Sequence, residues 1–267
     1  MEYKLIAVDL DDSLLGSDFQ ISDRNKEALI KAMEKGVLVT IATGRIFISA
    51  LKYAQQLELD VPIITYQGGL IKNAFSQDVL YNKTLPLAVC QKIIHVCKEK
   101  SLHLQVYIED EYYFEEDNKY SNMYYQQIGV KGIPVGPLDK FLVDEPNKLL
   151  IIDNPDRIVE MKGEFSKLFD SELEITTSKP EYLEFTHKDA TKGNALEYLA
   201  NLKGIERERV IAIGDSYNDI SMLQYAGLAV AMGNAPEDVK RHADYVTGTN
   251  DEDGVAQAIH RFVLERS

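Results

Sequence analysis

The chain has 267 residues, of which 45% are hydrophobic and 27% are charged, and it contains only 16 glycines and 8 prolines. This composition excludes collagen-like, low-complexity and disordered proteins, and it leaves enough apolar residues for one large domain or two modest ones. Lys and Arg number 29 against 43 Asp and Glu, a formal net charge of −14. Nucleic acid and membranes are therefore not expected as partners, whereas a small anionic substrate responds to local charge.

The first 65 residues alternate apolar strands with helices. Residues 4–9 form a continuous apolar run that ends in Asp9, which is typical of a buried parallel strand. Two helices and two further strands are expected next: a helix from the N-cap Ser22 to Gly36, a strand over 37–42, a helix after Thr43-Gly44-Arg45 to about Leu57, and a strand over 62–65. Elements of these lengths predict βαβ units and a parallel sheet with helices on both faces.

Residues 83–187 follow a different pattern, with helices and antiparallel hairpins that predict a separate α+β domain. Its expected elements are helices over 86–100, around 120–125 and up to about 169, strands over 102–108, 112–115, 148–152, 173–177 and 182–186, and a loop over 132–137. Cys90 and Cys97 lie seven apart in the first helix and are expected as two reduced thiols on one face. The tyrosines fit either an aromatic core or a sugar-binding face: Tyr107, Tyr112, Tyr113, Tyr124 and Tyr125.

After residue 188 the first pattern returns. A helix is expected over 192–202, an apolar strand over 210–215 that ends in Asp215, a strand over 228–231 and a closing helix over 252–265. The predicted fold class is therefore α/β: residues 1–82 and 188–267 form a Rossmann-like, doubly wound parallel sheet, and residues 83–187 form an inserted domain. The chain shows neither a signal peptide nor a run of ~20 apolar residues, so a soluble, cytoplasmic protein is expected.

Ligands of such sheets bind beyond the carboxyl ends of the strands, and the polar residues expected there are Asp9, Thr43 and Asp215. Asp9 and Asp11 are two apart, so both can face one site while the residue between them points away. Two carboxylates that close do not both ionise cheaply unless a cation neutralises one of them. The alternative for this segment is a solvated, Asp-rich turn.

Three other segments each have a functional and a plain interpretation. Thr43-Gly44-Arg45 exposes backbone N–H groups before a helix, which suits an anion but also an ordinary N-cap. Lys192 places a cation at a helix start, where anions are usual, and could also be a simple surface lysine. Asp215, Asn218 and Asp219 follow a buried strand and suit a hard cation such as Mg²⁺, or only cap the next helix.

Taken together, Asp9-x-Asp11, Thr43, Lys192 and Gly214-Asp215-Ser216-Tyr217-Asn218-Asp219 resemble the four motifs of the haloacid dehalogenase superfamily, in the same order and over nearly the whole chain. The α+β insertion between Thr43 and Lys192 resembles a type IIB cap, and the residues of the motifs around Thr43 and Asp215 resemble those of the Cof-type branch. Two features depart from the family pattern. Asp12 and Ser13 stand where the family usually has Gly and Thr, and Gln67-Gly68 replaces a frequent Asn-Gly pair after the third strand.

The resemblance implies a phosphomonoester hydrolase that uses Mg²⁺ and an aspartyl-phosphate intermediate. Asp9 would be the nucleophile and Asp11 the general acid and base. The remaining implied roles are Mg²⁺ ligation by Asp9, the backbone carbonyl of Asp11, and Asp215; phosphate binding by the Leu10 backbone, Thr43, Gly44, Lys192 and Asn218; support by Asp219 and Arg45; and substrate contacts in the cap by Glu184 and His187.

The implied substrates are small phosphorylated metabolites, either sugar phosphates or phosphorylated cofactors such as pyridoxal phosphate or FMN. A phosphomutase that shares the aspartyl-phosphate step remains an alternative, and so does a non-catalytic regulator that binds a phosphorylated ligand. The second carboxylate at Asp11 argues against the regulator, since binding alone does not need it. The sequence leaves the leaving group and the oligomeric state open.

Overall fold

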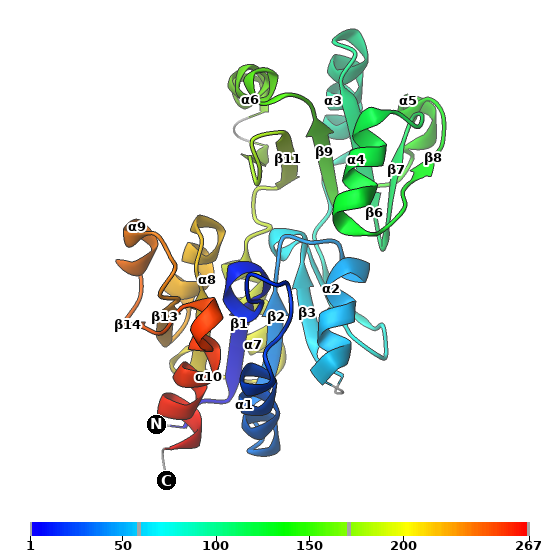
Figure 1. Cartoon of the computed structure of the whole chain (residues 1–267). Helices are drawn as coiled ribbons and strands as arrows, with labels where there is room; N and C mark the ends of the chain where they lie inside the picture. The colour runs from blue at the N-terminus through cyan, green and yellow to red at the C-terminus, as the bar shows by residue number, and fades with distance from the viewer. Residues whose placement is uncertain (1, 58–59, 170–171, 266–267) are drawn as a thin grey trace. The chain divides into compact units, whose positions relative to one another are not determined.

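The computed structural model describes residues 2–57, 60–169 and 172–265 (Figure 1). The chain divides into two compact units: the first holds residues 1–45, 50–81 and 191–267, and the second holds residues 46–49 and 82–190. The domain boundaries expected from the sequence stay a prediction. None of the described helices combines the length and the apolar composition that crossing a bilayer requires.

The first unit is built on an eight-stranded sheet in the order β14-β13-β12-β1-β2-β3-β4-β5. Its strands are β1 (Leu5–Asp9), β2 (Leu38–Ala42), β3 (Pro62–Thr65), β4 (Leu70–Asn73), β5 (Val79–Asn82), β12 (Val210–Gly214), β13 (Leu228–Ala231) and β14 (Tyr245–Val246). The helices of this part of the chain are α1 (Asp23–Glu34), α2 (Phe47–Ala54), α7 (Lys192–Leu202), α8 (Ile220–Tyr225), α9 (Glu237–Lys240) and α10 (Gly254–Ile259).

The strands from β14 to β3 are parallel, as the sequence predicts. Leu5 and Ala7 of β1 are fully buried in one apolar cluster with residues of α7 and α8. Successive side chains of a strand point to opposite faces, so the buried Ile6 and Val8 point to the other face of the sheet. Helix α1 covers that face and packs against β2 and α10. Helices on both faces confirm the α/β class.

The prediction of a parallel sheet is wrong at one edge. β4 runs antiparallel to β3, with Thr65 opposite Leu70, and β5 follows β4 at the end of the sheet. The sequence analysis predicted neither strand. Each has only four residues, and β5 is partly or fully exposed along its length, so neither shows the long apolar run of a buried strand or a clear alternation.

Local signals place the helix ends where they were expected. The Ser22 hydroxyl caps α1 by accepting a hydrogen bond from the Asn25 N–H at 3.1 Å. Gly36, just beyond the helix, has a positive φ of 77°, a conformation that glycine adopts without strain. The Thr191 hydroxyl caps α7 in the same way, so the helix begins at Lys192.

The second unit contains a six-stranded sheet in the order β10-β11-β9-β6-β7-β8. Its strands are β6 (His103–Ile108), β7 (Glu111–Phe114), β8 (Ile133–Pro134), β9 (Lys148–Ile152), β10 (Leu173–Thr176) and β11 (Tyr182–His187), and its helices are α3 (Leu87–Glu99), α4 (Lys119–Ile128), α5 (Leu138–Phe141) and α6 (Pro155–Phe169). The predicted hairpin is confirmed as β10 and β11. The predicted loop over 132–137 contains the two-residue strand β8, which is too short for its side chains to alternate detectably.

The second unit contains an apolar cluster and a group of buried tyrosines. On one face of its sheet, α3 and α6 pack into an apolar cluster that includes Cys90 and Cys97, both free thiols, and burial raises the pKa of Cys90 to about 12. Tyr107, Tyr112 and Tyr124 are also buried, with ring centroids of neighbouring pairs 5.5 and 5.3 Å apart. These three tyrosines therefore belong to an aromatic core.

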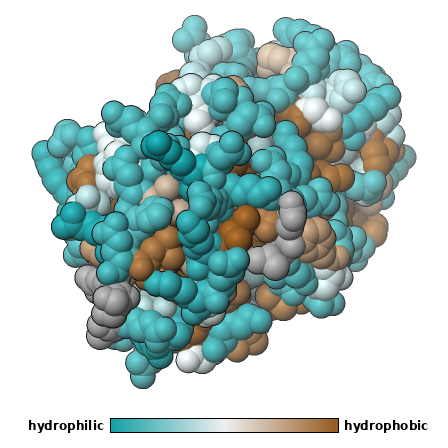
Figure 2. Space-filling view, turned by 60° about the horizontal axis from the view of Figure 1, so that its bottom comes forward, coloured by the Kyte–Doolittle hydropathy of each residue, from teal (hydrophilic) through white to brown (hydrophobic). Residues whose placement is uncertain are grey.

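The surface is largely hydrophilic on the face that Figure 2 shows, with smaller apolar areas between the hydrophilic side chains. A hydrophilic surface of this kind is expected where acidic and basic residues together make up 27% of the chain.

Candidate active site

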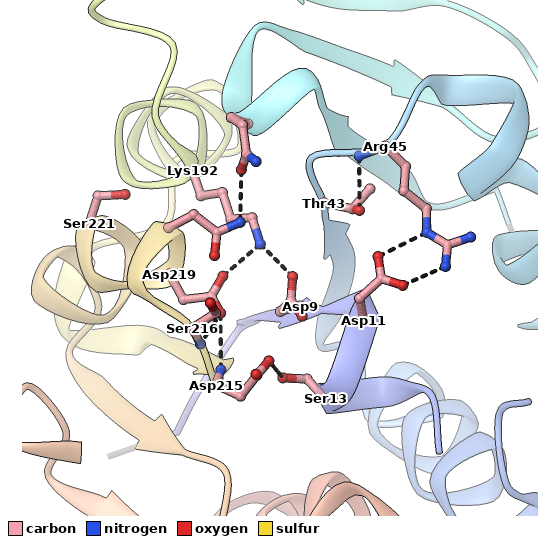
Figure 3. A network of polar contacts seen from close by, with 12 residues as sticks. Asp9, Asp11, Ser13, Thr43, Arg45, Lys192, Asp215, Ser216, Asp219 and Ser221 are labelled. Carbon is pink, nitrogen blue, oxygen red and sulfur yellow. Dashed lines mark hydrogen bonds and ion pairs between the residues drawn. The ribbon is translucent and has the colours of Figure 1, made fainter. Parts of the chain in front are cut away.

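Asp9 lies at the carboxyl end of β1, in the middle of the parallel sheet (Figure 3). The neighbouring strands β2 and β12 end beside it, which brings the segments that begin at Thr43 and Asp215 to the same edge. Asp9 is only 5% exposed and Thr43 1%. The convergence expected from the order of strands and polar residues is therefore present.

Lys192 reaches this point from the first turn of α7. Its side chain is fully buried, and its ammonium group donates to Asp9 Oδ1 and, at 2.6 Å, to Asp219 Oδ1. Burial by itself lowers the pKa of Lys192, but the charges of Asp219 and Asp9 outweigh this effect and raise it. Lys192 therefore remains a cation inside the protein, and a simple surface lysine is excluded.

Asp215 and Asp219 complete the acidic cluster. Asp219 Oδ2 accepts hydrogen bonds from the backbone N–H groups of Asp215 and Ser216 at 3.0 and 2.9 Å, so both of its oxygens are engaged. Asp215 Oδ1 accepts a 2.8 Å hydrogen bond from the Ser13 hydroxyl. Ser13 thus fixes the orientation of Asp215, while Asp219 holds the turn and the lysine in place.

The cluster has the donor set and the charge of a divalent cation site. Carboxylate oxygens of Asp9, Asp215 and Asp219 lie within 4.8 Å of one another. If all three carboxylates were ionised, the single ammonium of Lys192 would leave two net negative charges in a buried place. Burial, then the charge of Asp219, raise the pKa of Asp9 well above its usual value, and burial raises the pKa of Asp215 to about 6. A hard cation such as Mg²⁺ would relieve this excess.

Asp11 points away from this cluster and toward Arg45 (Figure 3). Arg45 Nε donates to Asp11 Oδ2 at 2.8 Å, and Arg45 Nη2 donates to Asp11 Oδ1, so the pair is bidentate. Two parallel hydrogen bonds fix both the position and the plane of a carboxylate. The guanidinium in turn lies 5.2 Å from the centre of the Tyr53 ring.

The turn that carries Asp11 also explains the unusual residue that follows it. Asp12 has a positive φ of 58°, the left-handed region where the family usually places glycine. Asp is one of the few other residues that tolerate this region. Asp12 is therefore compatible with the backbone conformation of this turn, although it departs from the family's usual glycine.

The proposed phosphate-binding residues surround Asp9. The Thr43 hydroxyl accepts a 3.1 Å hydrogen bond from the Arg45 N–H, which leaves its own proton free to donate. The Leu10 side chain is fully buried, so only its backbone can serve a ligand. Asn218 is exposed and donates through Nδ2 to Gln67 Oε1 at 2.9 Å. Their contacts with phosphate stay a prediction.

The two candidate contacts of the second unit, Glu184 and His187, both form polar contacts inside that unit. Glu184 is 5% exposed, and its Oε1 accepts from Lys148 Nζ at 2.8 Å and from Ser178 Oγ at 2.7 Å. His187 is partly exposed and accepts a 3.0 Å hydrogen bond from the Asp189 N–H at Nδ1. Glu184 thus has a structural role inside its own unit, and both substrate contacts stay predictions.

Gln67 also lies beside the proposed phosphate-binding residues Gly44 and Asn218, although the sequence assigns it no role. The pattern Gln67-Gly68 after the third strand stood out only as a departure from the family's usual Asn-Gly. The structure places its carboxamide against Gly44 and in a hydrogen bond with Asn218. A polar residue just before a glycine at a strand end was the available signal.

The parallel sheet, with carboxylates and a buried lysine at its strand ends, defines an α/β enzyme of the kind that works at the carboxyl edge of the sheet. The family model for haloacid dehalogenase-like hydrolases matches residues 6–259. The chain therefore belongs to the haloacid dehalogenase-like hydrolase family, and the resemblance drawn from its four motifs is confirmed.

Several relatives extend over the whole chain. A 5-amino-6-(5-phospho-D-ribitylamino)uracil phosphatase of Bacillus subtilis is 35% identical over 266 residues, which cover 99% of this chain and 97% of the relative. A crystal structure of a Thermotoga maritima protein superimposes with a TM-score of 0.90 at 32% identity, covering 97% of each chain. A subclass IIB sugar phosphatase superimposes with a TM-score of 0.83 at 28% identity, covering 97% of this chain and 98% of the other. With the family match, these relatives identify an enzyme of the phosphatase type.

Proposed function

We propose that this phosphatase hydrolyses phosphomonoesters of small metabolites through an aspartyl-phosphate on Asp9, with Mg²⁺ as its cofactor. One observation supports the proposal above all: Asp9 is bound by Lys192 through one oxygen only. Its other oxygen has no hydrogen-bond partner within the described residues. A buried carboxylate with one free oxygen, beside a fixed cation, is suited to attack phosphorus.

Asp9 and Asp215 would supply side-chain oxygens to Mg²⁺, and Asp11 its backbone carbonyl. Asp219 is proposed to orient the cluster instead of binding Mg²⁺ directly, because its two oxygens already accept hydrogen bonds from Lys192 and from two backbone N–H groups. When bound, Mg²⁺ would neutralise the charge between the nucleophile and the phosphate.

In the first step, the free oxygen of Asp9 attacks phosphorus and the bond to the leaving alcohol breaks. Asp11, whose two oxygens both accept from Arg45 in this structure, takes up a proton and turns one oxygen toward the departing oxygen, to which it donates that proton. Lys192, the Thr43 hydroxyl and backbone N–H groups at Gly44 and Leu10 stabilise the negative charge on the phosphoryl oxygens.

In the second step, water attacks the phosphorus of the aspartyl-phosphate. Asp11, now ionised, takes a proton from that water, and the bond between phosphorus and Asp9 breaks. Inorganic phosphate leaves, and both carboxyl groups return to their starting state.

The substrate class is proposed as sugar phosphates or phosphorylated cofactors such as pyridoxal phosphate or FMN. Three Bacillus subtilis relatives named 5-amino-6-(5-phospho-D-ribitylamino)uracil phosphatase are 35%, 30% and 32% identical to this chain, and a sugar phosphatase has the same fold. An open-chain or cyclic polyol phosphate therefore belongs among the first compounds to test. The cytoplasmic location expected from the sequence remains a prediction.

The experiment measures initial rates of inorganic phosphate release from these esters, with Mg²⁺ and with excess EDTA, and with no bisphosphate added. We expect turnover with Mg²⁺ and its loss with EDTA. Asp9→Asn should lower turnover by about 10³-fold or more, because an amide is isosteric but not nucleophilic. Asp238→Asn, the same change at an exposed residue of α9, is the matched control and should leave the rate unchanged.

Each alternative has its own outcome. Isomerisation of a phosphate ester that requires a bisphosphate primer, without release of inorganic phosphate, would identify a phosphomutase. A flat response to the whole panel with Mg²⁺ would favour the non-catalytic regulator. Turnover by Asp9→Asn close to the wild-type rate would contradict the nucleophile assignment.

A further inference from the structure

The turn Tyr66–Gly68, which follows β3, has an unusual backbone. Tyr66, Gln67 and Gly68 have successive positive φ values of 52°, 60° and 111°. Only the third is a glycine, and bulky residues rarely adopt this region. Strain of this kind persists where surrounding contacts hold it, and it is concentrated at functional sites.

Two backbone hydrogen bonds hold the turn against the loop that carries the proposed phosphate ligands. The Tyr66 N–H donates to the Arg45 carbonyl and the Gln67 N–H to the Thr43 carbonyl, both at 3.2 Å. The strained residues are therefore bound directly to Thr43 and Arg45, which flank Gly44.

The side of Gly44 is covered by the Gln67 carboxamide. A Cβ atom at Gly44 would lie 2.3 Å from Gln67 Nε2, closer than any van der Waals contact allows. On the other side, a Cβ atom at Gly68 would lie 2.2 Å from the Thr191 carbonyl oxygen, at the cap of the helix that begins with Lys192. The turn thus packs between two of the segments that carry the site.

The hydrogen bonds of Gln67 leave a donor free. Gln67 Oε1 accepts the 2.9 Å hydrogen bond from Asn218 Nδ2. Gln67 Nε2 has no hydrogen-bond partner in the part of the chain that the structure describes, and Gln67 is partly exposed. A carboxamide nitrogen carries two N–H donors, so this group can bind an anion beside Gly44.

We propose that Gln67 is a phosphate-binding residue: its Nε2 donates to an oxygen of the phosphoryl group, and its Oε1 orients Asn218 toward the same group. This inference rests on the proposed function, since it concerns the same phosphate. A neutral donor suits the position, because it binds an anion without changing the charge balance of the nearby carboxylates and lysine.

Because the contact is to the phosphoryl group, it is independent of the leaving group. Substitution of Gln67 should weaken binding of every phosphate ester by a similar factor, and of inorganic phosphate by the same factor. A residue that recognised the leaving group would affect some esters and leave inorganic phosphate unchanged.

The test compares wild type, Gln67→Glu and Gln67→Ala in the full chain with Mg²⁺. Inorganic phosphate is the probe, by calorimetric titration and by competitive inhibition of ester hydrolysis. Gln67→Glu keeps the length and the acceptor but replaces the donor by an anion, and should weaken phosphate binding about 10-fold or more, while Gln67→Ala should weaken it by about 3- to 10-fold. Gln224→Glu, the same change at an exposed residue of α8, is the matched control and should bind phosphate like wild type.

Wild-type phosphate affinity in Gln67→Glu would overturn the proposal, and so would a loss confined to certain esters. Circular dichroism of each variant shows whether it folds. If Gln67→Ala does not fold, the phosphate affinity of the isosteric Gln67→Glu variant decides whether Gln67 binds phosphate. Calorimetry does not need turnover. If the wild-type protein hydrolyses no ester, the proposed function fails. The phosphate affinities of wild type and the Gln67 variants still test whether Gln67 binds phosphate.

Discussion

At the scale of single residues, the site consists of buried charged side chains, each of which needs a neighbour of opposite charge. Lys192 is fully buried between Asp9 and Asp219, and removal of Lys192 would leave two buried carboxylates without their counter-ion. Asp11 has a different environment, because its bidentate partner is Arg45 and it is partly exposed. The nucleophile and the proposed acid and base are therefore held by separate cations.

The Asp11–Arg45 pair leads to a prediction about positioning. Arg45→Met removes both hydrogen bonds but keeps an apolar stem against Tyr53, so Asp11 should lose its orientation and kcat should fall by about 10- to 100-fold. Asp11→Asn should lower kcat by at least as much. If Arg45 acts through Asp11, the double variant should be no slower than Asp11→Asn alone. Steady-state kinetics of the four proteins complete the cycle, and additive losses would show that Arg45 acts on the substrate directly.

At the scale of elements, the close approach of α7 and α8 positions Lys192. Gly193 is the second residue of α7, and its N–H donates to Ser221 Oγ of α8 at 3.0 Å. A Cβ atom at Gly193 would lie 2.4 Å from the Ser221 carbonyl oxygen. This oxygen belongs to the backbone, so a side-chain rotation cannot relieve the clash. A side chain there would push apart the two helices that carry Lys192 and follow Asp219.

Two glycine-to-alanine substitutions in helices should therefore have opposite effects on stability. Gly193→Ala should destabilise the protein by about 1–3 kcal/mol through overpacking, and should also lower activity by moving Lys192. Gly163→Ala lies inside α6, where the added carbon has no neighbour within 4 Å among the described residues beyond the backbone of its own helix, and should stabilise the protein by about 0.5–1 kcal/mol. Thermal unfolding followed by circular dichroism measures both, and a higher Tm for Gly193→Ala would contradict the close approach.

At the scale of the whole molecule, stability depends on pH through buried groups as well as through the net charge of −14. His103 is 8% exposed, and burial lowers its pKa from 6.5 to about 4. The Asn118 side-chain oxygen Oδ1 accepts from the Tyr120 and Ser121 N–H groups, so Asn118 Nδ2 faces the His103 ring and donates to its Nδ1 at 2.9 Å. That contact requires a neutral ring with a free acceptor.

The expected pH dependence follows from the direction of this shift. Between pH 6.5 and about 4, His103 is protonated in the unfolded chain and neutral in the folded one, so folding stability is lost as pH falls through this window. The full effect is roughly 3 kcal/mol. Urea unfolding at pH 7 and pH 4.5, followed by circular dichroism, should show a smaller difference between the two pH values for His103→Gln than for wild type. His242→Gln, at an exposed histidine, should show the wild-type difference.

Most elements could be predicted because their signals are local. β1 and β12 are apolar runs with a polar residue at or directly after their carboxyl end. The capping residues Ser22 and Thr191 mark the starts of α1 and α7. β4, β5, β8 and β14 were missed, because strands of two to four residues at or next to a sheet edge carry no clear periodicity. Edge strands are stabilised by their neighbours in the sheet, and a sequence does not display those neighbours.

The sequence by itself determined which residues meet at the sheet edge. Asp9, Thr43 and Asp215 each follow a buried strand, and parallel strands end at the same edge, so their convergence follows from chain order alone. Only the tertiary structure decided how these residues pair: Ser13 with Asp215, Arg45 with Asp11, and Gln67 with Asn218. The physical reason is that side-chain pairing depends on orientation and packing between segments up to 202 residues apart, which local patterns of polarity do not encode.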